Sequence, residues 1–90
     1  MPQLEFDILS KLYFIEAFDR LLEEVNASPN EIRDGLRNLL GRQYVAAFVF
    51  DFRHNRFEQT AVYDTDSLEE YFFGATQKGI KLHSEGAADA

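Results

Sequence analysis

The sequence contains no cysteine, only two prolines and only five glycines in 90 residues. The absence of cysteine excludes a disulfide framework, a zinc site with cysteine ligands and a thiol nucleophile. The glycines are scattered, and they form no glycine-rich phosphate-binding loop. The longest apolar run, Tyr44–Phe50, is far shorter than the roughly 20 residues that a membrane-spanning helix needs.

The chain also lacks the features of a secretory signal, because residues 1–7 contain neither a basic nor an extended apolar segment. We therefore expect a cytoplasmic protein without membrane contact. A length of 90 residues with 46% apolar side chains predicts a single domain with its own core. Residues 84–90 carry no large apolar side chain, so the predicted domain comprises 1–83 and is followed by a disordered tail.

The first part of the chain has the apolar spacing of helices. Phe18, Leu21, Leu22 and Val25 follow the i, i+3, i+4, i+7 pattern of one helix face. No glycine or proline interrupts residues 4–25, which favours one continuous helix. The length favours two helices that meet near residues 14–16, because long helices are uncommon in small domains. Both possibilities stay open.

A second helix signal begins at Ser28. Ser28 is a suitable N-cap residue, Pro29 suits the first helical position, and Glu31 completes a capping box. These signals predict a helix over residues 29–40, with Gly41 as its C-cap. The apolar stripe of this helix consists of Ile32, Leu36, Leu39 and Leu40.

Strands are predicted next. Residues 44–52 are rich in β-branched and aromatic types, residues 57–63 alternate in polarity, and the polar turn 53–56 joins them into a β-hairpin. Because residues 44–52 are largely apolar on both faces, we expect that strand to be well buried. The second strand completes a hairpin over residues 44–63.

Residues 64–82 allow two interpretations. Ser67 and Glu70 have the spacing of a second capping box, which predicts a helix. Alternatively, residues 71–73 form a third strand, and Thr76 caps a final helix through Leu82. The expected fold class is therefore α+β, ending in a helix or in a strand plus helix.

The order of helix, helix, turn, helix and hairpin resembles a winged helix-turn-helix domain. The resemblance is carried by four segments: Phe18-x-x-Leu21-Leu22, the helix from Ser28 to Leu40, Tyr44-Val45, and Ala75-Thr76-x-x-Gly79. It implies a dimeric, DNA-binding, regulator-like module in which residues 29–40 are the recognition helix and the hairpin is the wing. Residues 64–72 are extra relative to that pattern.

The charge distribution bears on this implied function. Sixteen acidic and nine basic residues give a net charge of −7, which opposes binding to phosphate. However, five of the six arginines and only two acids lie in residues 33–56, which leaves +3 there and −10 elsewhere. Under the resemblance, double-stranded DNA would be contacted from the helix and from the hairpin turn. The predicted DNA-binding residues are Asn30, Arg33, Arg37, Asn38, Arg53 and Arg56.

Other chemistry finds little support in the sequence. Asp51 and His54 are only two potential metal ligands, and neither His54 nor His83 belongs to a metal-binding motif, so we expect no metal site. No serine or threonine lies in a nucleophile motif, so we expect neither an enzyme nor a bound cofactor.

Aromatic residues are the other conspicuous feature, with nine phenylalanines and four tyrosines. A domain of this size has too little interior for all of those in residues 48–73, so some should reach the surface as an association patch. A homodimer is the simplest outcome. The alternative function is a protein-interaction domain of winged-helix shape that does not bind nucleic acid.

Overall fold

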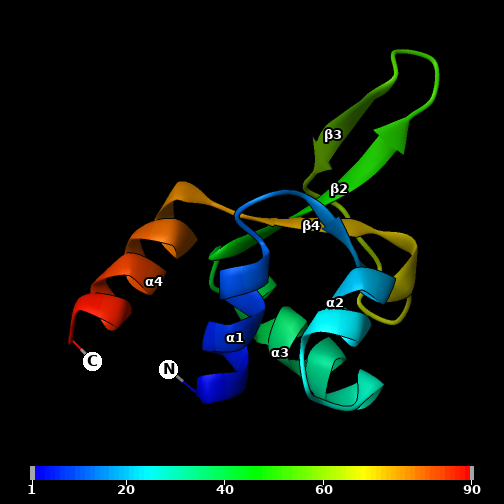
Figure 1. Cartoon of the computed structure of the whole chain (residues 1–90). Helices are drawn as coiled ribbons and strands as arrows, with labels where there is room; N and C mark the ends of the chain where they lie inside the picture. Colours follow the sequence, from blue (N-terminus) through cyan, green and yellow to red (C-terminus); the bar gives the residue numbers. More distant parts are fainter. Residues whose placement is uncertain (1, 90) are drawn as a thin grey trace.

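A computed structural model describes the backbone of residues 2–89 and the side chains of residues 2–86. Helices and strands both contribute, and the predicted α+β class is confirmed (Figure 1). The elements are α1 (Gln3–Lys11), β1 (Glu16–Ala17), α2 (Phe18–Glu24), α3 (Pro29–Gly41), β2 (Val45–Asp51), β3 (Arg56–Thr60), the 3-10 turn η1 (Leu68–Glu70), β4 (Phe72–Ala75) and α4 (Gln77–Asp89).

The four strands form one antiparallel sheet in the order β1-β4-β2-β3. Strand β4, late in the chain, therefore lies between β1 and β2. Helices α1, α2 and α3 lie on one side of this sheet, while the β2–β3 hairpin projects well beyond them (Figure 1). None of the described helices is long and apolar enough to cross a bilayer.

The core lies between the sheet and the three helices. Val45, Ala47 and Phe73 alternate toward the helices, and all three are buried. Gly35 in the middle of α3 permits close contact with α1, because a Cβ there would lie 2.8 Å from the Cδ1 atom of Ile8. The helices and Leu12, the C-cap of α1, contribute the fully buried side chains of Ile8, Leu9, Leu12, Leu21, Ile32, Leu36 and Leu39.

Residues 4–25 form two helices, so the interpretation as one continuous helix is wrong. The break follows from a pairing with a distant segment. The Leu12 amide bonds to the Leu9 carbonyl and ends α1, and the Leu12 carbonyl accepts a 2.7 Å hydrogen bond from the Ala75 amide. The chain then forms the short strand β1, which pairs with β4.

The N-terminal capping box of α3 is confirmed. The Glu31 amide donates to Ser28 Oγ at 3.2 Å, and the Ser28 amide donates to Glu31 Oε1 at 3.0 Å. The predicted C-cap is wrong, since Gly41 is still helical and Arg42 is the C-cap. Gln43 adopts the left-handed conformation (φ 64°) that usually favours glycine.

The hairpin is confirmed with shorter strands than predicted. Its expected burial is wrong for half of β2, because Val45–Ala47 are buried whereas residues 48–51 are partly or largely exposed. The reason is geometric: residues 49–51 of β2 pair only with β3 and extend beyond the helices. We call residues 49–58, which form this projecting part of the hairpin, the arm.

After the hairpin, the strand-plus-helix alternative is confirmed. Strand β4 is followed by α4, and Thr76 Oγ1 accepts a 3.0 Å hydrogen bond from the Gly79 amide. A helix capped by Ser67 is wrong: the Ser67 side chain caps no helix and instead donates to Asp64 Oδ2. The backbone of α4 continues to Asp89, where a disordered tail was predicted, and Ala90 lies outside the described residues.

Candidate functional site

The two predicted site arginines on α3, Arg33 and Arg37, already contact other parts of the chain. Arg33 Nη1 donates to Asn30 Oδ1 at 2.9 Å, and Arg33 Nε lies 3.6 Å from Glu69 Oε2. The guanidinium group also lies over the Phe18 ring at 5.4 Å. These contacts hold Arg33 against the protein surface and leave its side chain 30% exposed.

Arg37 makes more hydrogen bonds to the rest of the chain than Arg33 does. Its Nη1 atom donates to Asp34 Oδ1 at 2.9 Å, and its Nε and Nη2 atoms donate to the Thr65 carbonyl at 3.2 and 3.0 Å. Asp66 Oδ1 lies 3.8 Å from the same guanidinium group. Because Glu69 reaches Arg33 in the same way, residues 64–70 lie across the arginines of α3. We call this segment the acidic strap.

The acidic strap is tied to the protein at its middle and at its end. Leu68 is fully buried in the core, and the Asp64 amide donates to the Tyr71 hydroxyl at 3.0 Å. Its carboxylates neutralise the α3 arginines, so phosphate groups would have to displace Asp66 and Glu69 to bind there. The polar side of α3 therefore presents no net positive charge around these arginines.

The arm tip carries the other predicted cations. Arg53 is exposed, and Arg56 Nη2 lies 3.4 Å from Glu58 Oε1. Asp51 accepts hydrogen bonds from His54 Nδ1 at 2.6 Å and from the Arg53 amide at 2.9 Å. The bond from the His54 side chain is the main cause that lowers the pKa of Asp51. Two arginines and two carboxylates thus leave the tip without net charge.

The structure does not gather the six predicted residues into one basic surface. Asn30 and Asn38 are exposed on α3, Arg33 and Arg37 lie beside the acidic strap, and Arg53 and Arg56 lie on the arm. Residues 64–72 are extra relative to the winged-helix resemblance, and nothing in their local pattern indicates that they pack on α3. The contacts depend on the tertiary path of the chain, which local patterns do not contain.

A second surface, which we call the aromatic face, lies on the side of the sheet that faces away from α1–α3. Side chains alternate along a strand, so Phe48 and Phe50 share this side, and their register partners Phe72 and Phe57 lie beside them. Ring centroids are 5.1 Å apart for Phe50–Phe57 and 5.0 Å apart for Phe57–Phe72, with edge-to-face geometry. Phe52 continues the row, 4.9 Å from Phe50.

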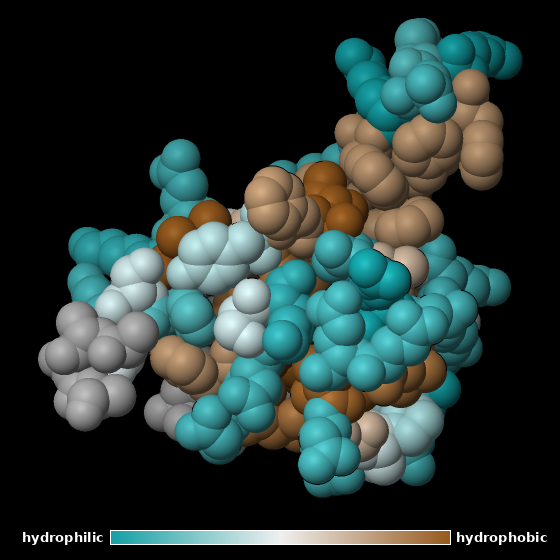
Figure 2. Space-filling view, viewed as in Figure 1, coloured by the Kyte–Doolittle hydropathy of each residue, from teal (hydrophilic) through white to brown (hydrophobic). Residues whose placement is uncertain are grey.

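The aromatic face is open to solvent at its outer end, whereas Phe48, Phe50 and Phe72 are half-buried. Phe52 is 87% exposed and Phe57 is 39% exposed. Figure 2 shows apolar side chains gathered along the projecting hairpin, below a hydrophilic tip. None of the helices in the described part of the chain covers this surface in Figure 1. The predicted surplus of surface aromatics is therefore confirmed.

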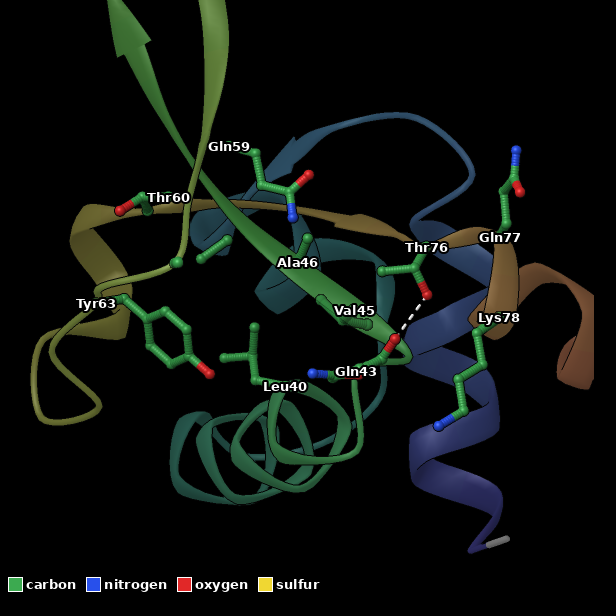
Figure 3. A pocket seen from close by; sticks show the side chains of 12 residues that line it. Leu40, Gln43, Val45, Ala46, Gln59, Thr60, Tyr63, Thr76, Gln77 and Lys78 are labelled. Atoms are coloured by element: carbon green, nitrogen blue, oxygen red, sulfur yellow. Dashed lines mark hydrogen bonds between the residues drawn. The ribbon is translucent and has the colours of Figure 1, made fainter.

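A groove of about 470 Å³ lies beside the base of the hairpin (Figure 3). It forms because β3 ends at Thr60, opposite Ala47, so the start of β2 has no neighbouring strand on that side. Leu40 and Val45 provide apolar lining, and Lys78 lies at one end. Lys78 Nζ is engaged by the Arg42 carbonyl at 3.1 Å and the Tyr44 ring at 4.9 Å.

Comparisons of the chain with protein-family models, curated proteins and solved structures found no match. Function must therefore be inferred from the geometry of this molecule. The aromatic face is the surface whose solvent exposure most needs an explanation, because large apolar side chains on a projecting hairpin are costly to hydrate.

Proposed function

We propose that this domain is a protein-interaction module that self-associates through the aromatic face. The observation that carries the proposal is the row of edge-to-face phenylalanines from Phe72 to Phe52, whose outer members Phe52 and Phe57 are exposed to solvent. Burial of an exposed phenylalanine side chain contributes roughly 1.5–3 kcal/mol. A few such side chains on each copy are enough to offset much of the entropic cost of association.

A second copy of the chain fits this surface on electrostatic grounds. The arm carries Asp51, Arg53, Arg56 and Glu58, whose charges cancel, whereas the whole chain has a net charge of −7. Contact through the projecting arms brings neutral surfaces together and keeps the acidic bodies apart, where salt screens their repulsion over about 8–10 Å. Two identical aromatic faces are also self-complementary about a two-fold axis.

The test is the molar mass of the protein in solution. Light scattering on a sizing column should give twice the 10.4 kDa chain mass for the wild type and the chain mass for Phe52→Ser. Phe14→Ser is the matched control, because Phe14 is 81% exposed but precedes β1, at the other edge of the sheet. A wild type that stays monomeric at high concentration would reject the proposal.

DNA binding is the second candidate function. The element order α1-β1-α2-α3-β2-β3 supports the winged-helix interpretation, and Arg53 and Arg56 on the arm tip are exposed cations. The acidic strap argues against it, because Asp66 and Glu69 already pair with the arginines of α3. The two candidate functions therefore predict different effects of changes in the arm. Self-association predicts a change in molar mass, and DNA binding predicts a change in the affinity for duplex DNA.

Titration against labelled duplex DNA at low and moderate salt tests this candidate. A phosphate-driven complex should weaken steeply with salt, and the double change Arg53→Ala and Arg56→Ala should flatten that slope. The matched control is Arg20→Ala, which removes a cation on α2 that pairs with Glu24. Low-salt binding no tighter than that of an unrelated acidic protein would exclude the DNA interpretation.

A further inference from the structure

The face of the arm opposite the phenylalanines carries a group of three potential metal ligands. In the β2–β3 register Glu58 lies opposite Val49, and Val49 and Asp51 are two residues apart. Side chains two residues apart share a face, so Asp51 and Glu58 project to the same side of the arm. His54 in the connecting turn reaches back to them. One ligand atom from each side chain lies within 4.8 Å of the other two.

We propose that Asp51, His54 and Glu58 bind a divalent transition-metal ion of the zinc and nickel type. One imidazole nitrogen and two carboxylate oxygens form a mixed donor set that suits these ions better than Mg²⁺ or Ca²⁺, which prefer oxygen donors alone. The sequence pattern alone indicates only two ligands here, Asp51 and His54. Glu58 is the third, and strand pairing across the turn brings it to the other two.

Hydrogen bonds within the turn fix the position of the Asp51 carboxylate, which favours binding of such an ion. Asp51 Oδ1 accepts hydrogen bonds from the Arg53 amide at 2.9 Å and the His54 amide at 3.3 Å, which fixes the carboxylate. Its other oxygen, Oδ2, lies 2.6 Å from His54 Nδ1. A metal ion bonds nitrogen and oxygen at roughly 2.0–2.2 Å, so it would replace the proton shared by these two atoms after a small outward shift.

Arg56 is the group that competes with the ion. Its Nη2 atom lies 3.4 Å from Glu58 Oε1, and its positive charge repels a cation. An ion bound to Glu58 would lie close to this guanidinium group. Removal of the Arg56 charge should therefore strengthen metal binding, an effect that a purely structural role of the cluster would not produce.

The experiment titrates the untagged full chain with ZnCl₂ and with NiCl₂ by calorimetry, with MgCl₂ as the hard-ion comparison. We expect one site per chain whose affinity falls about tenfold or more in His54→Ala and in Glu58→Gln, and rises in Arg56→Gln. His83→Ala is the matched control, since His83 is the other histidine and packs against Phe6 and Tyr13. Circular dichroism confirms that each variant folds.

The outcomes separate clearly. Absence of zinc and nickel binding to the wild type at millimolar metal overturns the proposal, as does a His54→Ala variant that binds like the wild type. Amide shifts in an NMR titration should be confined to residues near 51–58, and shifts centred on His83 would place the ion elsewhere. Self-association through the aromatic face is tested by the molar mass measured without metal. The metal-binding proposal and the self-association proposal can therefore be rejected independently.

Discussion

At the scale of single residues, Glu5 is the clearest departure from an apolar interior. The residue is 6% exposed in the interface between α1 and α3, and its Cγ atom lies 3.8 Å from the position that a Cβ on Gly35 would occupy. Among the described side chains, none donates a hydrogen bond to Glu5 Oε1. A buried oxygen without a donor reduces stability, because it has lost its bonds to water.

Replacement of Glu5 by methionine should therefore stabilise the protein. Methionine has a similar length and brings no polar atom, so the expected gain in the free energy of unfolding is about 1–3 kcal/mol. Glu5→Gln keeps a polar end and should gain less. Urea denaturation of both variants measures this, and a lower unfolding midpoint for Glu5→Met would show that the carboxylate makes a favourable contact.

The capping box of α3 should make stability depend on pH. The backbone hydrogen bond from Ser28, and after it the bond with the Ser28 side chain, lowers the pKa of Glu31 below its ordinary value of 4.5. A lowered folded-state pKa means that the contribution is complete above pH 4.5 and is lost as pH falls through the folded pKa. Glu31→Gln keeps an oxygen acceptor without titrating.

Urea midpoints measured from neutral pH down through this acid range test the prediction. The wild-type midpoint should fall more steeply below pH 4.5 than that of Glu31→Gln. Some acid dependence should persist in the variant, because Asp51 also has a lowered pKa through its bond with His54. Parallel curves for the two proteins would show that the capping carboxylate contributes nothing in its charged form.

At the scale of elements, the acidic strap and α3 form one structural unit. Arg37 joins them through two hydrogen bonds to the Thr65 carbonyl and through its proximity to Asp66. Hydrogen bonds from a charged donor to a carbonyl are stronger than those between neutral groups. Arg37 is therefore better explained as a brace for the acidic strap than as a free DNA contact.

Arg37→Gln should loosen this unit without unfolding the domain. We expect a loss of about 1 kcal/mol in the free energy of unfolding, since the group is partly exposed, and faster hydrogen exchange of amides in residues 64–67. Arg20→Gln removes an arginine whose partners lie within its own stretch of chain, Glu16, Glu23 and Glu24, and should change little. Unchanged exchange in 64–67 would contradict the bracing role.

The elements also show which features the sequence could predict. The start of α3 was predicted because Ser28, Pro29 and Glu31 act on one another within a single turn. The hairpin was predicted because both strands and their turn are consecutive. The capping of α4 by Thr76 was one of two open alternatives, since a local cap signal competed with another at Ser67.

Two of the features that were missed depend on segments far apart in the chain. The break after α1 requires the Ala75 amide, and the covering of Arg37 requires the Thr65 carbonyl. Such partners are set by the fold, and spacing along the chain does not reveal them. The end of α3 is different, because it is closed locally: the Tyr44 and Gln43 amides bond back to the Leu39 and Leu40 carbonyls, and Gln43 is the left-handed residue although Gly41 is nearby.

At the scale of the whole molecule, two parts differ in what stabilises them. The body has a continuous core that includes the fully buried Phe73, whereas the arm has aromatic contacts on one face and polar groups on the other. The chain measures 43 Å along its longest axis and 26 Å and 21 Å across the others. Changes in the arm should therefore affect association more than the folding of the body.

This difference predicts how thermal unfolding responds to protein concentration. If the aromatic faces associate in the folded state, mass action stabilises that state, and the midpoint temperature should rise with concentration. Phe52→Ser should remove the concentration dependence and match the wild-type midpoint measured in dilute solution, because Phe52 is 87% exposed and contributes little to the body. Phe73→Ala should instead lower the midpoint temperature at every concentration, because it should cost about 3–5 kcal/mol in the free energy of unfolding. The wild-type midpoint could instead be independent of concentration and equal to that of Phe52→Ser. In that case the exposed phenylalanines have no role in self-association, and a different protein would be the partner to test.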